Sequence, residues 1–89
     1  MVQAHIFFSG TVQGIGFRYA VLQSAQNLKI TGWVRNLDDG RVEAVFEGPK
    51  EDIEKLCESV EKHFEGYIQS KEIDFFEPQN QFKDFKIVH

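Results

Sequence analysis

The chain has 89 residues, 42% of them hydrophobic and 27% charged, and a formal net charge of −4 at pH 7. This length predicts a single domain, residues 1–89, of ordinary soluble composition. The acidic charge argues against nucleic-acid and anionic-membrane partners, which need a basic face, but it allows a small anion in one local positive pocket.

The cysteine content and the hydropathy of the chain indicate the cellular compartment of the protein. Cys57 is the only cysteine, so the chain can form neither an intramolecular disulfide nor a cysteine-based metal site. No apolar run approaches the ~20 residues that cross a bilayer. The first residues also lack the basic and apolar regions of a signal peptide. We therefore expect a cytoplasmic protein, and we expect it to be a monomer.

The first half of the chain predicts a strand, a helix and a hairpin. Residues 2–9 are an apolar run typical of a buried strand, and apolar residues recur at helical spacing over residues 17–28. The segment TGWVRNLDDGRVEAVFEG then predicts a hairpin with a two-residue type I′ turn at Asp39-Gly40. In its second arm the residues alternate, which predicts one buried face and one mostly solvated face that carries Glu43 and Glu47.

The second half predicts a helix followed by two strands. Pro49 suits the start of a helix over residues 50–64, which carries one apolar stripe. Residues 68–76 and 82–88 are interpreted as strands. The order β-α-β-β-α-β with a short extra C-terminal strand predicts an α+β fold, the ferredoxin-like split βαβ sandwich, in which two helices cover one face of an antiparallel sheet.

Three glycines in nine residues mark the segment GTVQGIGFR, residues 10–18, between the first strand and the first helix. Glycines there can turn backbone N–H groups toward one bound anion, although a tight turn needs glycine for its dihedral angles alone. The Walker loop is excluded because Phe17-Arg18 follows Gly16 where lysine and serine or threonine would stand. The dinucleotide fingerprint is excluded because Tyr19 occupies its third glycine position.

Arg18 favours the anion-binding interpretation. A cation in the first turn of a helix opposes the helix dipole, at a cost of roughly 0.3–1 kcal/mol when exposed. A bound dianion would compensate for that cost, and the planar guanidinium suits phosphate oxygens. A solvated surface arginine is the alternative.

Asn36 is the second polar candidate, in the segment GWVRN. In a strand it shares a face with Val34, and asparagine is disfavoured in strands. It therefore either begins the turn that follows or serves as a functional amide. His5, His63 and His89 have no ligand-like spacing, and we find no general base, metal site or partnered nucleophile.

The segments GTVQGIGFR, GWVRN and DGRVEAVFEG together resemble the acylphosphatase family, and the likeness covers essentially the whole chain. The resemblance implies metal-independent hydrolysis of acyl phosphates to a carboxylate and inorganic phosphate, without a cofactor. It implies that Arg18 binds the phosphoryl group through its guanidinium and that Asn36 orients the attacking water. The backbone amides of the phosphate cradle would be those of Gln13, Gly14, Ile15, Gly16, Phe17 and Arg18.

The sequence departs from the family pattern at two places. Ile15 replaces the usual valine of the loop, and Lys29 stands where the family often has glycine at the helix exit. The segment from Tyr67 onward matches the family loosely. The main alternative function is a non-catalytic phosphate- or small-anion-binding module of the same fold. An RNA-binding domain shares the element order but needs basic and aromatic residues on the central strands, where Glu43 and Glu47 stand.

Overall fold

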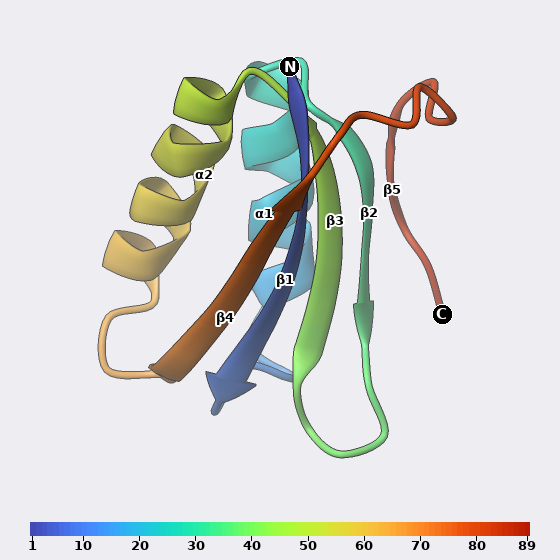
Figure 1. Ribbon diagram of the computed structural model, residues 1–89. Helices are drawn as coiled ribbons and strands as arrows, with labels where there is room; N and C mark the ends of the chain where they lie inside the picture. The colour runs from blue at the N-terminus through green and yellow to red at the C-terminus, as the bar shows by residue number, and fades with distance from the viewer.

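A computed structural model describes residues 1–89, with two helices on one face of a five-stranded sheet (Figure 1). The strand order is β4-β1-β3-β2-β5. The elements in chain order are β1 (Val2–Gly10), α1 (Phe17–Asn27), β2 (Thr31–Asn36), β3 (Val42–Gly48), α2 (Lys50–His63), β4 (Ile68–Phe76) and β5 (Phe85–Ile87). The predicted ferredoxin-like arrangement is confirmed, and the predicted last strand is shortened to three residues.

The predicted antiparallel sheet is wrong at one edge. Strands β4, β1, β3 and β2 pair antiparallel, but β5 pairs parallel to β2, with Gly32 opposite Phe85 and Val34 opposite Ile87. After β4 the chain crosses the end of the sheet and enters β5 from the side where β2 begins (Figure 1). Because β2 has a free edge, it accepts the short strand in the direction that this crossover imposes.

The core lies between the helices and the sheet. Eighteen buried hydrophobic residues form one cluster, to which β1 gives Ala4, Ile6 and Phe8, and α1 gives Phe17, Val21 and Ala25. The residues of α1 are spaced by four, so one helix face meets the alternate residues of the strand. This packing fixes the start of α1 against the end of β1. Neither helix is long and apolar enough to span a membrane.

The hairpin between β2 and β3 has a longer loop than predicted. The N–H of Leu37 donates to the carbonyl of Arg41 at 2.8 Å, and the N–H of Gly40 donates to the carbonyl of Leu37 at 3.2 Å. Gly40 has a φ of 95°, whereas Asp39 is not in the left-handed region. A type I′ turn needs positive φ at both central residues, so the chain instead uses three loop residues with glycine at the last.

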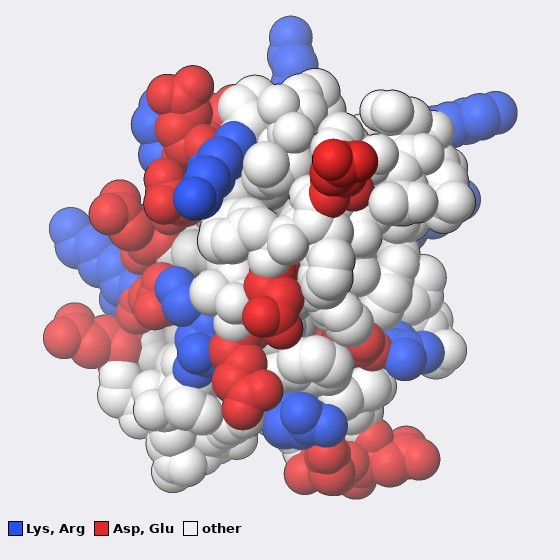
Figure 2. Space-filling view, in the orientation of Figure 1, with Lys and Arg blue, Asp and Glu red and all other residues white.

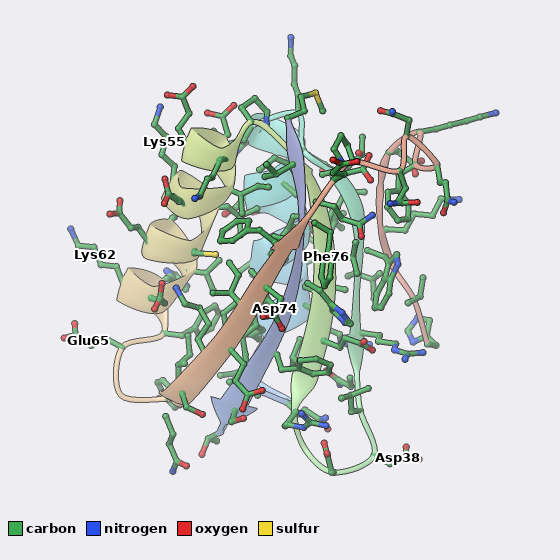
Figure 3. All side chains as sticks on the ribbon, in the orientation of Figure 1. Asp38, Lys55, Lys62, Glu65, Asp74 and Phe76 are labelled. Atoms are coloured by element: carbon green, nitrogen blue, oxygen red, sulfur yellow. The ribbon has the colours of Figure 1, made fainter.

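The second face of β3 is not solvated, contrary to the sequence prediction. Glu43 and Glu47 are only 7% and 3% exposed, because β3 is the central strand and other side chains cover it. Charged side chains of both signs are scattered over this face, and Asp74 and Phe76 of β4 lie on it (Figures 2 and 3).

Both buried carboxylates have partners. Glu43 lies 2.6 Å from His5 Nε2 and accepts a hydrogen bond from Arg35 Nε at 2.7 Å. Burial alone would raise the pKa of Glu43, but the hydrogen bonds and charges of His5 and Arg35 outweigh it and lower the pKa. Glu47 accepts the backbone N–H groups of Gln79 and Asn80, which holds the crossover before β5 against the sheet.

The chain leaves helix α1 through a residue in the left-handed region, two positions after Asn27. Lys29 has a φ of 57°. Its N–H donates to the carbonyl of Gln26 at 3.2 Å, and the N–H of Ile30 donates to the carbonyl of Ala25 at 2.8 Å. This pair of hydrogen bonds is the Schellman arrangement, in which glycine is the preferred residue at the position of Lys29. The departure from the family pattern therefore places a strained lysine at this helix exit.

We expect Lys29→Gly to raise the free energy of unfolding by about 0.5–1 kcal/mol, because glycine adopts this conformation without steric strain. Urea denaturation at pH 7 measures the change. The matched control is Asn80→Gly at the other non-glycine residue of positive φ (55°), where asparagine already tolerates the conformation. Equal effects at the two positions would contradict the explanation.

Candidate active site

Three strands that run in the same direction bring the candidate site to one edge of the sheet. β3 lies antiparallel between β1 and β2, so β1 and β2 run the same way, and β5 runs parallel to β2. The loop of residues 11–16 follows β1 at that edge, and Asn36 is the last residue of β2. Residues twenty or more positions apart are thus brought to one end of the fold.

The glycine-rich loop presents unpaired backbone donors. Gly14 and Gly16 have φ angles of 78° and 80°, a conformation that other residues rarely adopt. None of the six N–H groups from Gln13 to Arg18 donates to a backbone carbonyl; the first such hydrogen bond of α1 is from Ala20 to Gly16. A Cβ added at either glycine would meet nothing within 4 Å. The space and the free donors suit an anion at a helix N-terminus.

The side chains of Gln13 and Ile15 attach the loop to the rest of the protein. The Gln13 side chain donates to the carbonyls of Leu37 and Arg41 at 2.7 and 2.9 Å, which ties the loop to the β2–β3 hairpin. Ile15 is partly buried against the hydrophobic core. Neither residue lines the hollow described next, so their side chains hold the loop in place.

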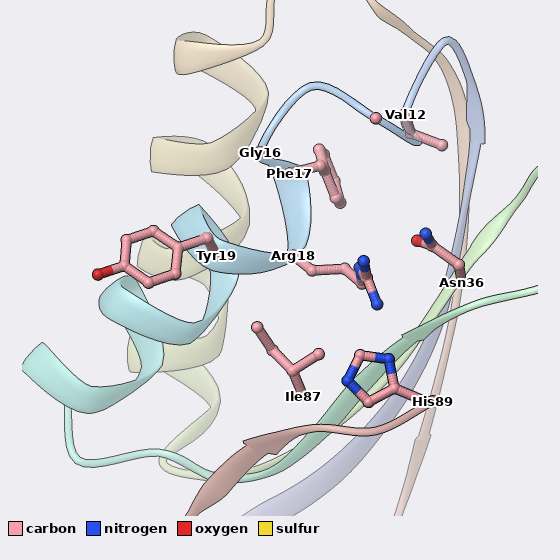
Figure 4. A pocket seen from close by; sticks show the side chains of 9 residues that line it. Val12, Gly16, Phe17, Arg18, Tyr19, Asn36, Ile87 and His89 are labelled. Carbon is pink, nitrogen blue, oxygen red and sulfur yellow. The ribbon is translucent and has the colours of Figure 1, made fainter.

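Arg18 and Asn36 line the same hollow, a cavity of about 290 Å³ (Figure 4). Arg18 extends from the start of α1 toward Asn36 and His89 (Figure 4). α1 has no acidic residue in its first turn, and Arg18 has no salt-bridge partner. The complete lining is Val12, Gly14, Gly16, Phe17, Arg18, Tyr19, Asn36, Ile87 and His89.

Asn36 carries an unsatisfied oxygen. Its Oδ1 atom is buried and has no hydrogen-bond partner, and it is the only buried side-chain polar atom of the protein in that condition. The residue lies on the core face of β2 with Val34, which is fully buried, as the strand alternation predicts. An unpaired buried acceptor is destabilising, which makes it a candidate for binding a ligand or a water molecule.

Both the sequence and the fold match known proteins. A family model for acylphosphatases matches residues 4–87. The chain belongs to the acylphosphatase family. An acylphosphatase of Haloarcula marismortui is 45% identical over 78 residues, covering 86% of each chain. The crystal structure of acylphosphatase from Bacillus subtilis superposes with a TM-score of 0.90 at 35% identity, covering 100% of both chains.

Matches to some other family members cover a shorter segment of this chain. An acylphosphatase of a Nostoc species is 55% identical over 56 residues, which are 63% of this chain and 55% of that relative. The matched segment thus spans about half the length of that curated acylphosphatase.

Four residues that line the hollow were not predicted from the sequence: Val12, Tyr19, Ile87 and His89. Ile87 and His89 reach it only because β5 is parallel to β2. The alternation of Phe85, Ile87 and His89 was visible in the sequence, but the direction of pairing was not. Tyr19 is 59% exposed and directly follows Arg18, the last residue of the glycine-rich segment.

We expect Asn36→Leu to raise the free energy of unfolding by about 1 kcal/mol, because a leucine of similar size removes the unpaired buried oxygen. Urea denaturation measures it. Val34→Thr, the next inward position of β2, is the matched control and should lower stability, because it buries a new hydroxyl. Destabilisation by Asn36→Leu would show that the oxygen is satisfied in solution.

Proposed function

We propose that this protein is an acylphosphatase that hydrolyses acyl phosphates to a carboxylate and inorganic phosphate, with residues 1–89 acting as one catalytic domain. The observation that carries the proposal is the combination around one hollow of unpaired loop amides, the Arg18 guanidinium and Asn36, whose buried side-chain oxygen is unsatisfied. The first two features suit a phosphoryl group, and the third suits a water molecule.

In this proposal the phosphoryl group binds to the loop and to Arg18. The cradle consists of the backbone amides of Gln13, Gly14, Ile15, Gly16, Phe17 and Arg18. Their free N–H groups lie at the positive end of the α1 dipole, which favours a dianion. The Arg18 side chain donates from its planar fork to the phosphoryl oxygens and neutralises part of their charge. Catalysis of phosphoryl transfer rests mainly on such positioning and charge stabilisation.

Asn36 orients the attacking water in this proposal. The water oxygen attacks phosphorus, and the bond from phosphorus to the acyl oxygen breaks with its electron pair leaving on the carboxylate. The water proton passes to a phosphoryl oxygen of the substrate. A carboxylate is a good leaving group, so the reaction as proposed uses neither a general acid nor a metal ion, and phosphate competes with the substrate.

The second candidate is a phosphate- or small-anion-binding module without catalysis, which would use the same loop and Arg18. The unsatisfied Asn36 oxygen favours the enzyme, because an anion would repel an acceptor atom, whereas a water molecule donates to it. We also propose a monomeric, cytoplasmic protein without nucleic-acid or membrane partners. The net charge of −4 supports the absence of those two partners.

We expect Arg18→Ala to reduce kcat/KM for benzoyl phosphate by about 10²–10³-fold, with weaker binding and slower turnover, because it removes charge stabilisation in both states. The assay uses chelator-treated protein. Arg18→Lys, which keeps the charge but not the fork, should be intermediate. Wild-type activity in Arg18→Ala would contradict the assigned site.

We expect Asn36→Ala to lower kcat on the order of 100-fold with little change in the inhibition constant of phosphate, because it disturbs the water and leaves the cradle intact. Steady-state kinetics with phosphate as inhibitor separate the two effects. Wild-type protein that binds phosphate but does not hydrolyse benzoyl phosphate would favour the binding module.

A further inference from the structure

His89 lies beside Asn36 because of the parallel pairing of β5 with β2. The paired residues end with Val34 opposite Ile87. Continuing this register by two residues in the same direction brings Asn36 opposite His89, and neighbouring strands lie about 4.8 Å apart. The alternation also puts both side chains on the face that holds the core. Figure 4 accordingly shows the imidazole and the amide in the same hollow, with the Arg18 guanidinium between them and the start of α1.

Asn36 and His89 also separate this hollow from a second one. A cavity of about 320 Å³ is lined by Arg35, Asn36, Leu37, Asp38 and His89. The two cavities share only the side chains of Asn36 and His89. Arg35 is engaged by Glu43, so the second cavity offers uncommitted polar groups mainly from the shared pair and from Asp38. This cavity can hold water next to the pair.

Neither shared side chain has a partner for its functional atoms. The Asn36 Oδ1 atom is buried and unpaired, and no hydrogen bond or salt bridge engages the His89 ring. A water molecule held by one hydrogen bond can still rotate about it, and a well-ordered water has two to four polar partners. Asn36 alone therefore cannot fix the direction of the lone pair that attacks phosphorus, whereas two neighbouring side chains can.

We propose that His89 is a further catalytic residue, which holds the attacking water together with Asn36. This inference rests on the proposed acylphosphatase activity. A ring nitrogen of His89 accepts one hydrogen of the water while Asn36 Oδ1 accepts the other, and the water lone pair then faces a phosphoryl group in the cradle. The water enters from the second cavity, and in-line displacement requires the acyl group to leave from the side of phosphorus opposite this water. As the water oxygen bonds to phosphorus, one of these two hydrogen bonds breaks and its proton passes to a phosphoryl oxygen, so the products are unchanged and His89 gains no proton.

The test compares the wild type with His89→Ala, His89→Gln and Val88→Ala in benzoyl phosphate hydrolysis. We expect His89→Ala to lower kcat about 10-fold, the equivalent of one lost hydrogen bond, without changing the inhibition constant of phosphate. His89→Gln should recover part of the loss, because its amide oxygen accepts the same hydrogen. Val88→Ala should match the wild type, since Val88 lies on the opposite side of the strand in another cavity.

A double variant distinguishes a shared water from two separate roles. If Asn36 and His89 act on one water molecule, Asn36→Ala/His89→Ala should be no more than about 2-fold slower than Asn36→Ala alone. Independent, multiplying losses would overturn the proposal, as would weaker phosphate binding or wild-type kcat in His89→Ala. Inactive wild-type protein would overturn the proposed function together with this inference. If the wild type is active and His89→Ala has the same activity, this inference alone is overturned.

Discussion

The antiparallel pairing of β3 between β1 and β2 is the constraint on which the candidate site depends. It makes β1 and β2 run the same way, so the loop after β1 and the last residue of β2 meet at one edge of the sheet. The core packing of Phe8 against Phe17, with ring centroids 5.0 Å apart, then fixes where α1 starts relative to that edge. Arg18 follows directly on that buried residue, and its position is therefore fixed by the hydrophobic core.

At three positions, a feature that the proposed site uses lowers the stability of the free protein. Gly14 and Gly16 adopt left-handed conformations that strain other residues, although a Cβ would meet no neighbouring atom there, and Asn36 buries an unpaired oxygen. Each feature costs stability in the free protein, through backbone entropy or desolvation. A bound phosphoryl group and its water would use these features, so the cost is consistent with the function we propose. The strained Lys29 at the far end of α1 has no such link to the hollow.

Sequence reasoning succeeded where local chemistry decides the structure. The element order, both helices and the strand β4 follow from hydrophobic periodicity and turn residues, and the predicted family is confirmed by the family model. The predictions from the sequence were wrong where side chains of neighbouring strands decide which residues are buried. The solvated face of β3 was predicted from alternation, yet Glu43 is buried because His5 and Arg35 on the adjacent strands cover and pair with it. Strand alternation identifies two faces, but it does not reveal whether a polar face is covered.

Residue types along the chain indicate the chemistry available at the site: a glycine-rich loop that can free its amides, an arginine at a helix start and an asparagine near the end of a strand. Those properties belong to residue types and their spacing along the chain. Which distant residues join them depends on how the strands pair in the folded protein. Ile87 and His89 reach the hollow because β5 runs parallel to β2, and the opposite direction would place them at the far end of that strand. Strand direction depends on how the crossover before β5 packs across the sheet, and no local pattern in a three-residue strand encodes it.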